Sequence, residues 1–449
     1  MKILLVQPAK APDTIGCEDI FLYEPLALEY LASALVSDHD VRIIDLRLEK
    51  NLKEIFNEFN PDIVGVTAYT VHVNIVKELC KVMKLWNPGI FTVVGGHHAT
   101  VSYMDFIESS IDLIIMGEGV FVFKEVISRF EKNTGFEGLP GTAYPKDGKI
   151  IMTSPIPVTD LDSFPFPARS LTTDYRKSYF SEWRKPLATI RTSQGCPYRC
   201  NFCALWKLNG GRYLTRKPEK IVEELSGIKE KFIFFADDES LIDTVRMSSL
   251  AKLIKESRIK KRYFLYSRSD TIVRHPEVIE QWKEIGLERI FIGLEFFRDK
   301  DLEDVRKKSS TKDNEEAVRI LQNLDISIFG SFIIRPDFTR DDFREFKKYC
   351  RSLRLHLPVF SVLTPLPGTD YYEEVKDKLI THNYDYFDLL HSLQETRLPL
   401  KEFYEEFYQL YRNSSSPLDR IYMLLKYSPQ EIIKVIRMSN RIRNACNSI

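Results

Sequence analysis

The sequence lacks the features that mark membrane, secreted and nucleic-acid-binding proteins. No apolar run approaches the roughly 20 residues of a membrane span, and the apolar start, Met1–Pro8, is too short for a signal peptide. Lys plus Arg and Asp plus Glu both number 64, so no overall field draws the chain to nucleic acid or anionic lipid. We therefore expect a soluble, cytoplasmic protein, and its 449 residues are enough for two or three domains.

Cysteine is also scarce, with only seven in the chain. Scattered cysteines build neither a disulfide framework nor a second metal-binding cluster. Three of the seven form one group, Cys196-x-x-x-Cys200-x-x-Cys203. The other four are isolated: Cys17, Cys80, Cys350 and Cys446.

The three grouped cysteines follow an apolar, strand-like run and predict a cluster-binding loop. Thiolates ligate iron–sulfur clusters, and because a cubane of four irons normally takes four of them, three would leave one iron open to a small molecule. Gly195 and Pro197 prevent the loop from continuing as strand or helix, so the thiols can converge. A zinc site or buried structural thiols is the alternative, although zinc knuckles usually pair two CxxC units and a second unit is missing.

The CxxxCxxC spacing, with Phe202 directly before the last cysteine, resembles the radical SAM superfamily. The resemblance implies a [4Fe-4S] cluster on Cys196, Cys200 and Cys203. It also implies that the open iron chelates the amino and carboxylate groups of S-adenosylmethionine (SAM), with Phe202 near the adenine.

Residues 1–130 alternate short β-rich runs with helical patterns such as Glu24–Val36 and Val73–Trp86. This alternation predicts βαβ units and a doubly wound, Rossmann-like parallel sheet. Ligands of such sheets lie beyond the carboxyl ends of the strands. The predicted strands are Lys2–Gln7, Val41–Asp45, Asp62–Thr67, Phe91–Val94 and Asp112–Met116.

The turns after these strands contain paired glycines, which let a bulky ligand approach the backbone. Glycine can also close such a turn with no ligand involved. Upstream of a cluster loop, the GGxH and GEG turns resemble the cobalamin-binding domain of class B radical SAM enzymes, in which they border the nucleotide tail. The resemblance implies these cobalamin-binding residues: Thr67, Tyr69, Thr70, His72, Gly95, Gly96, His97, Gly117, Glu118 and Gly119.

One feature of other cobalamin proteins is missing. Their Asp-x-His-x-x-Gly motif supplies an axial histidine, whereas this chain reads Asp13-Thr14-Ile15-Gly16 after the first strand. We therefore expect the lower face of cobalt to be open or to face a side chain near Tyr69–His72. His72, His97 and His98 are interpreted as loop residues rather than metal ligands, and ligation by one of them stays open.

The rest of the chain divides into three predicted segments. Residues 131–185 contain a hairpin and a proline-rich connector. Residues 186–370 contain six βα repeats, typical of a partial barrel, and residues 371–449 are helical. The predicted barrel strands are Leu187–Thr192, Lys231–Ala236, Arg262–Arg268, Arg289–Glu295, Ile326–Ile334 and Leu357–Leu363.

Charged residues stand at the carboxyl ends of these strands, where barrels carry their chemistry. A zwitterionic ligand with a ribose needs carboxylates for its ammonium and hydroxyls, and a guanidinium for its carboxylate. By resemblance, Asp237 and Asp238 meet the SAM amino group, Arg268 the carboxylate and Glu295 the ribose. Each residue could instead be half of a surface ion pair.

Two features distinguish the helical end of the chain. Phe403, Phe407 and Tyr411 recur every four residues, which favours packing against the barrel mouth over contact with an apolar substrate. Between Asp419 and Ile449, six Lys or Arg stand against two acids. Such a basic amphipathic helix can rest on a membrane surface or a partner, or can simply be a solvated end.

Together these resemblances imply a cobalamin-dependent radical SAM C-methyltransferase, which passes a methyl from SAM through methylcobalamin to an unactivated carbon. The runs Cys203–Tyr213, Phe235–Ser240 and Phe332–Asp337 resemble the subgroup that contains hopanoid C-3 methylases, so a hopanoid-type lipid is the favoured substrate. A flavodoxin or ferredoxin is the electron donor expected from the family.

Three alternatives stay open at this point. The substrate could be an amino-acid side chain in a protein, such as the glutamine methylated in methyl-coenzyme M reductase. Cobalamin could serve a radical rearrangement or cyclisation without methyl transfer. The chain could also be a cobalamin-responsive binding protein, although the intact cysteines, acids and arginine argue against that reading.

Overall fold

The computed structural model describes residues 1–355, 357–414, 421, 425 and 428–445. Its contacts divide the chain into two compact units. Unit 1 consists of Met1–Thr14, Glu24–Ser178 and Asn383–Phe387, and unit 2 consists of Ile15–Tyr23, Tyr179–His382 and Asp388–Ile449. The sequence predicts four consecutive segments, whereas these two units are discontinuous in sequence. Ile15–Tyr23 belongs to unit 2, and Asn383–Phe387 belongs to unit 1.

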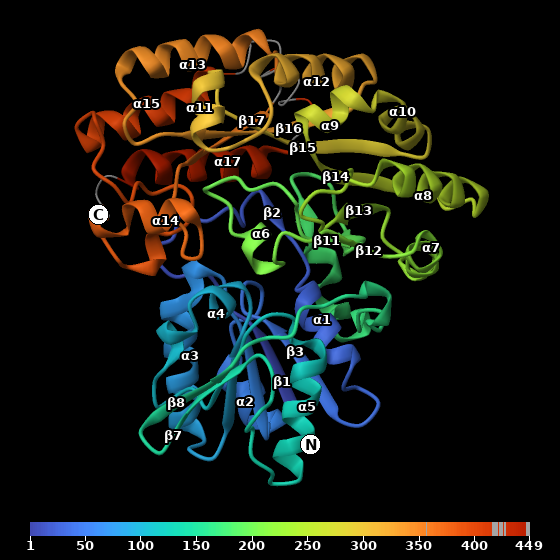
Figure 1. Cartoon of the computed structure of the whole chain (residues 1–449), viewed down its shortest axis with the longest axis vertical. Helices are drawn as coiled ribbons and strands as arrows, with labels where there is room; N and C mark the ends of the chain where they lie inside the picture. The colour runs from blue at the N-terminus through green and yellow to red at the C-terminus, as the bar shows by residue number, and fades with distance from the viewer. Residues whose placement is uncertain (356, 415–420, 422–424, 426–427, 446–449) are drawn as a thin grey trace. The chain divides into compact units, whose positions relative to one another are not determined.

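Unit 1 is built on a seven-stranded sheet in the order β3-β1-β4-β5-β6-β7-β8 (Figure 1). The pairs among the first five strands are parallel, which confirms the predicted doubly wound sheet. The last two strands, β7 and β8, form the predicted hairpin, and β7 pairs antiparallel with β6. The strands are β1 (Lys2–Gln7), β3 (Asp40–Asp45), β4 (Ile63–Thr67), β5 (Phe91–Gly95), β6 (Leu113–Ile115), β7 (Thr142–Lys146) and β8 (Lys149–Thr153).

Helices cover both faces of this sheet because its strands are apolar on both sides. In β1, Ile3 and Leu5 pack with α1 and α5, whereas Leu4 and Val6 pack with α2 and α3. The strands β1, β3, β4, β5, β6 and β7 each contribute to both cores. The helices are α1 (Leu26–Ser33), α2 (Leu52–Phe59), α3 (Val73–Trp86), α4 (His97–Val101) and α5 (Gly119–Glu131).

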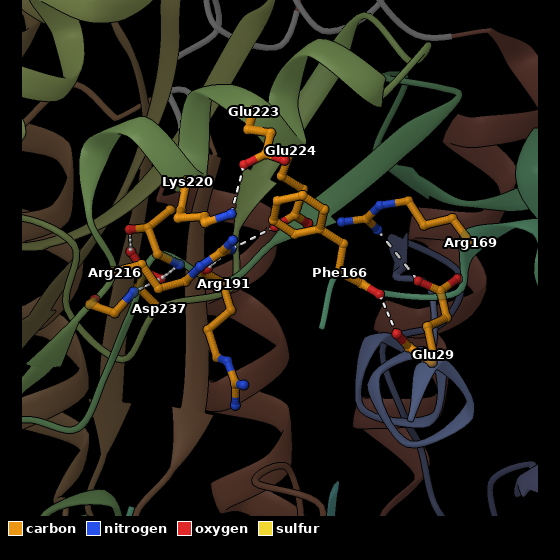
Figure 2. A network of polar contacts seen from close by, with 12 residues as sticks. Glu29, Phe166, Arg169, Arg191, Arg216, Lys220, Glu223, Glu224 and Asp237 are labelled. Carbon is orange, nitrogen blue, oxygen red and sulfur yellow. Dashed lines mark hydrogen bonds and ion pairs between the residues drawn. The ribbon is translucent and has the colours of Figure 1, made fainter. Parts of the chain in front are cut away.

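A buried group of four charges fastens the proline-rich connector to α1. Arg169 lies 3.0 Å from Glu24 and 3.4 Å from Glu29, the latter pair drawn in Figure 2, and Arg176 bonds the same two carboxylates. Thr172 donates a further hydrogen bond to Glu29. Both carboxylate side chains are fully buried, so each depends on the arginines for its solvation.

We expect a Glu29→Gln variant to lose part of the pH dependence of folding. Burial and the neighbouring Glu24 raise the pKa of Glu29 from 4.5 to about 7. Because the folded chain holds this proton more tightly than the unfolded chain, wild-type stability should fall as pH rises from about 4.5 to about 7 and then level off. Melting temperatures between pH 5 and 8 would check this, and equal slopes for both proteins would contradict it.

Unit 2 is built on a six-stranded parallel sheet in the order β10-β13-β14-β15-β16-β17. The arrangement confirms the predicted partial barrel of six βα repeats. Two short antiparallel pairs, β2–β9 and β11–β12, form separate two-stranded sheets. The strands are β2 (Phe21–Leu22), β9 (Phe180–Ser181), β10 (Leu187–Ile190), β11 (Ser193–Gln194), β12 (Leu214–Thr215), β13 (Phe232–Phe235), β14 (Arg262–Arg268), β15 (Leu287–Glu295), β16 (Ser327–Ile334) and β17 (Leu357–Val362).

One face of this sheet forms a large core with the surrounding helices, several of which follow its strands in Figure 1. Alternate strand residues such as Ile290, Ile292 and Leu294 point into that core. The helices are α6 (Leu205–Leu208), α7 (Pro218–Gly227), α8 (Thr244–Glu256), α9 (Ser269–Arg274), α10 (Pro276–Glu284), α11 (Asp299–Asp304), α12 (Thr311–Asn323), α13 (Arg340–Ser352), α14 (Asp370–Val375), α15 (Leu400–Asn413) and α17 (Pro429–Asn444).

The aromatic helix α15 packs on this helical side of the sheet rather than at the barrel mouth. Phe403 contacts Phe343 of α13, and Tyr411 donates a hydrogen bond to the Phe360 carbonyl of β17. The prediction that the aromatic residues are core is confirmed, but their expected place was wrong. Because no βα unit follows β17, α15 supplies the cover that this last strand needs.

The basic end of the chain is described only in part, since Asp419, Arg420, Lys426 and Cys446 lie outside the described residues. In α17, Met438 and Ile442 are buried in the helical core. Arg441 pairs with Asp19, and Arg443 pairs with Glu405. Within the described residues, no helix combines the length and apolar character needed to cross a membrane.

Candidate functional site

The three grouped cysteines of unit 2 lie in the loop between β11 and α6. Gly195 opens this loop with φ +91°, a conformation that favours glycine, and a Cβ here would overlap the Arg212 carbonyl oxygen. Cys200 is buried, whereas Cys196 and Cys203 are partly exposed. The loop therefore turns at its first residue and presents thiols rather than continuing the strand.

The far side of the cluster loop is held by backbone contacts. The Asn201 amide donates to the Val305 carbonyl at 3.1 Å, and the Tyr371 amide donates to the Asn201 carbonyl at 2.9 Å. Phe202 packs against the apolar group that contains Phe296 and Ile333. These contacts tie the loop to the segments after β15 and β17, so its position depends on the whole unit.

The three thiols are the candidate ligands of a multi-iron cluster. Burial raises the pKa of Cys196 to about 11 and that of Cys203 to about 12, and both thiols sense the charge of Cys200. Over the described parts of the chain, no three His, Cys, Asp or Glu side chains surround one common ion position. In a cubane each thiolate binds a different iron, so spaced thiols are the expected arrangement.

Two aspartates after β13 hold the start of the cluster loop. Asp237 is buried and accepts hydrogen bonds from the Thr192 and Ser193 amides, at 2.7 and 2.9 Å, and from the Thr192 hydroxyl at 2.6 Å. Asp238 accepts one from the Gly195 amide at 2.6 Å, and burial raises its pKa to about 6. Both carboxylate oxygens of Asp237 thus accept hydrogen bonds from the protein, whereas Asp238 accepts through one oxygen.

The same corner of the sheet is stiffened by a second buried ion pair, shown in Figure 2. Arg216 follows β12 and lies 2.6 Å from Glu224 of α7, with both side chains buried. It also donates a hydrogen bond to the Arg191 carbonyl at 2.8 Å, and its amide donates to the Thr192 carbonyl. The strand end that enters the cluster loop is therefore fixed from two sides.

Arg268, Glu295 and Lys307 gather beside Cys200. The Arg268 guanidinium carbon lies 3.7 Å from the centre of the Tyr198 ring. Lys307 donates a hydrogen bond to Glu295 at 2.7 Å, and the charges of Lys307, Arg268 and Glu295 all act on the pKa of Cys200. Burial acts to lower the pKa of Lys307, but the charge and hydrogen bond of Glu295, together with the charge of Cys200, leave the pKa raised, so the ammonium persists.

The backbone near this group leaves no room for an additional side chain. A Cβ on Gly293 would come within 2.5 Å of the Glu295 carboxylate and 2.9 Å of the Lys307 ammonium. Glu295 itself has φ +59°, which is rare for a residue other than glycine. The pair is thus held in one strained geometry, as is often found at ligand sites.

In unit 1, the predicted cobalamin-binding residues meet at the carboxyl ends of β4, β5 and β6. Tyr69 is 51% exposed, and its ring contacts the His97 ring edge-on, with centroids 4.9 Å apart. Gly96 has φ +107°, and a Cβ there would lie 2.8 Å from the backbone of Ala68. Gly117 donates its amide hydrogen to Thr100 at 2.9 Å. Thr67 and Gly95 end the paired strands β4 and β5, Thr70 begins the turn after β4, and Glu118 precedes α5, which starts at Gly119.

The histidines of this edge differ in what they can do. His72 is buried, burial lowers its pKa to about 4, and its Nδ1 accepts a hydrogen bond from the Tyr69 amide at 3.3 Å. His98 is fully buried, with Nδ1 at 3.1 Å from the Thr70 hydroxyl and Nε2 at 2.9 Å from Asp105. Both histidines therefore use ring nitrogens within the protein, and His97 is the exposed one.

A segment from the distant part of the chain completes this edge. Tyr384 donates a hydrogen bond to Asp105 at 2.8 Å, and Asn74 bonds Asn383 at 2.7 Å. Despite its partial burial, Asp105 has its pKa lowered to about 2 by hydrogen bonds from His98, Ser102 and Tyr384. The Asn383–Phe387 segment is thus an integral part of unit 1.

Sequence reasoning missed three residues of these sites. Lys307 carried no signal, because Lys307-Lys308 looks like a solvated pair, yet Lys307 is buried and Lys308 is exposed. Tyr198, within the cluster loop, was not expected to stack on Arg268. Glu239, which follows the two aspartates, is buried with its pKa raised to about 7 by that burial, and it faces the charges of Arg268 and Lys307.

Family comparisons agree with this division of the chain. Residues 190–350 match the model of the radical SAM superfamily, and residues 21–127 match the model of the B12 binding domain. A three-thiol loop on a partial barrel, together with a doubly wound B12-type sheet, defines a cobalamin-dependent radical SAM enzyme. Such an enzyme uses a [4Fe-4S] cluster, SAM and cobalamin.

Individual relatives narrow the class further. The chain is 33% identical to a hopanoid C-3 methylase of Methylococcus capsulatus, over 90% of this chain and 78% of that protein. It is 30% identical to an uncharacterized methyltransferase of Pyrococcus horikoshii, over 97% and 95%. The chain therefore belongs to the cobalamin-dependent radical SAM methyltransferases. Its fold matches OxsB with aqua-cobalamin and SAM bound, with a TM-score of 0.74 and 17% identity over 99% of this chain and 72% of that one.

Proposed function

We propose that this enzyme methylates an unactivated carbon of an apolar lipid of the hopanoid type. Support comes from the 33% identical hopanoid C-3 methylase, of which the match covers 78%. When bound, the cluster and SAM supply the radical that opens a carbon–hydrogen bond, and cobalamin supplies the methyl. We further propose a cytoplasmic enzyme reduced by a flavodoxin- or ferredoxin-type donor.

The gathering of Arg268, Glu295 and Lys307 beside Cys200 carries this proposal. We assign Cys196, Cys200 and Cys203 to the cluster, and Phe202 to the adenine side. Arg268 and Lys307 supply positive charge for the SAM carboxylate, and Glu295 accepts hydrogen bonds from the ribose.

The two aspartates receive different roles in this proposal. Asp238, bonded through one oxygen to Gly195, has acceptor capacity left for the SAM amino group. Asp237, which accepts three hydrogen bonds from Thr192 and Ser193, acts as a positioning residue for the loop.

In unit 1, the exposed edge formed by Tyr69, His97 and the Gly95-Gly96 turn is proposed to bind the corrinoid. His72 and His98 hold the turn through their internal hydrogen bonds. His72 accepts at Nδ1, so a neutral ring carries its proton on Nε2, and neither nitrogen is available to cobalt in this tautomer. His72 and His98 are therefore assigned to holding the turn rather than to ligating cobalt.

Product analysis tests the proposed reaction. The enzyme, loaded with cluster and cobalamin, would be incubated with methyl-deuterated SAM and a hopanoid, and separately with candidate peptide substrates. We expect deuterated methyl in the hopanoid, together with S-adenosylhomocysteine and 5′-deoxyadenosine. Absence of S-adenosylhomocysteine would overturn methyl transfer in favour of rearrangement, and label only in a peptide would overturn the lipid substrate.

A Gly95→Ala variant tests the corrinoid edge. Its Cβ would lie 3.6 Å from the nearest protein atom, an ordinary contact, so the fold should tolerate it. A ligand that approaches the backbone closely would be obstructed, and we expect cobalamin affinity to fall by about tenfold. Absorbance titration would measure this against Gly227→Ala, whose Cβ meets no protein atom within 4 Å. Equal affinity in both variants would exclude close approach at Gly95.

A further inference from the structure

The face of the unit 2 sheet opposite its helices carries aromatic side chains on four neighbouring strands. Phe234 of β13, Phe264 and Tyr266 of β14, and Phe291 of β15 form one apolar group separate from the helical core. Phe329 of β16 continues the row, with its ring stacked 5.3 Å from that of Phe291. Tyr23 covers part of this face, with its ring stacked 4.5 Å from that of Phe234, and the rings of β14 and β15 continue beyond it.

The rings differ in how far they are buried. Phe234, Phe264 and Phe329 are buried, whereas Tyr266 and Phe291 are partly exposed, with their centroids 4.6 Å apart. In the next row toward the carboxyl ends, Gly293 pairs with Arg268 on one side and with Ser331 on the other, and Ser331 pairs with Val359. On β15, β16 and β17 the three small residues Gly293, Ser331 and Val359 therefore replace the rings. All three are partly exposed. Tyr266 and Phe291 thus form a shelf below a row of small residues.

The shelf continues directly into the proposed SAM site. Phe291 and Gly293 lie on the same face of β15, and after a register shift the Glu295 carboxylate returns to within 2.5 Å of a Cβ built on Gly293. On β14, Tyr266 precedes Arg268 by two residues. Four residues of strand separate Phe291 from Glu295, a span of roughly 13 Å. A ligand on the shelf would therefore extend from the rings to the reacting end of the sheet.

The shelf carries no charge of its own. The charged groups on this face, Arg268, Glu295 and Lys307, engage one another or their neighbours at the carboxyl end. Below the shelf, Arg289 is 3% exposed, pairs with Glu182, and lies with its guanidinium carbon 5.5 Å and 5.2 Å from the ring centres of Phe264 and Phe329. The rings thus cover a paired charge and present an apolar surface.

We propose that the Tyr266–Phe291 shelf binds an uncharged ring system of the substrate, and that Phe291 sets which carbon reaches the SAM end. This inference rests on the proposed function and adds the residues that select its substrate. Aromatic faces pack on flat apolar rings, whereas a peptide segment would need backbone partners that these side chains do not offer. The small row at Gly293, Ser331 and Val359 gives the ring system room beside the reacting end.

Nile red, an uncharged fused-ring dye, would test the shelf on the full-length enzyme loaded with cluster and cobalamin. We expect Phe291→Ala to weaken dye binding by about tenfold relative to wild type, while Phe121→Ala, which removes an exposed ring in unit 1, has no effect. Iron content after cluster loading should match wild type in both variants, because neither residue lies in the cluster loop between β11 and α6. If Phe291→Ala loads no cluster, Phe291→Leu, which keeps apolar volume, replaces it.

The outcomes separate this inference from the proposed function. Equal dye binding by wild type and Phe291→Ala, or no dye binding by wild type, would overturn the shelf. Dye binding that depends on Phe291, with no stimulation of SAM cleavage by the hopanoid diplopterol, would support the shelf and overturn the hopanoid substrate. With an accepted hopanoid, we expect Phe291→Ala to raise KM by about tenfold and to shift the methylated position.

Discussion

A Gly195→Ala variant is expected to lose its iron–sulfur cluster. Its Cβ would overlap the carbonyl oxygen of Arg212 and lie 3.2 Å from the Cβ of Asn209. Neither neighbour can move freely, because Arg212 leads into β12, which pairs with β11 just before Gly195. The φ of +91° adds conformational strain for any residue with a Cβ. We expect iron content after reconstitution to fall by at least about tenfold, together with SAM cleavage.

Gly211→Ala is the matched control for this variant. Gly211 lies between α6 and β12 and also has positive φ, at +70°, but a Cβ there would meet no atom within 4 Å. It therefore adds strain without overlap, at a cost of about 1–2 kcal/mol, and should still load its cluster. Equal iron contents in the two variants would show that overlap with Arg212 does not govern the loop.

Lys307→Met is expected to weaken SAM binding strongly while leaving the cluster in place. The substitution removes a buried ammonium that bonds Glu295 at 2.7 Å and leaves that carboxylate unpaired. A charge-assisted hydrogen bond contributes about 1.5–3 kcal/mol, so SAM affinity should fall by about 10- to 100-fold. Equilibrium binding of SAM to the reconstituted protein, with iron content measured in parallel, would check this.

The neighbouring lysine provides the control. Lys308 is exposed, and its contact with Arg268 is through the backbone carbonyl, at 3.0 Å, so Lys308→Met should retain wild-type affinity. Lys307→Arg keeps the charge and should recover part of the loss. If Lys307→Met bound SAM as tightly as Lys308→Met, the role proposed for the Glu295–Lys307 pair would be wrong.

Much of the fold could be predicted because its strands are local and strongly apolar. The predicted bounds of Lys2–Gln7, Val73–Trp86 and Arg262–Arg268 coincide with those of the structure. Spacing also identified the cysteine loop, since its three thiols are close in sequence. Resemblance then extended the prediction to Arg268 and Glu295, which stand at strand ends where barrels place ligands.

What could not be predicted depends on which residues become neighbours after folding. Lys307 follows α11, outside any strand end, and becomes part of the site only because its ammonium reaches back to Glu295. The place of α15 was wrong because its aromatic spacing shows that one face is buried, but not which surface buries it. The Asn383–Phe387 segment is short and without periodicity, so its hydrogen bonds to Asn74 and Asp105 left no trace in the sequence.

The return of that segment constrains how the protein is made. Domains usually fold one after another as the chain leaves the ribosome. Here the leading domain is not complete until residue 387 has been synthesised, because Tyr384 supplies a hydrogen bond to Asp105. By then nearly all of the barrel has emerged. The leading domain can therefore complete its folding only after the Asn383–Phe387 segment has been synthesised. A gene fragment that ends before residue 383 would encode an incomplete corrinoid-binding domain.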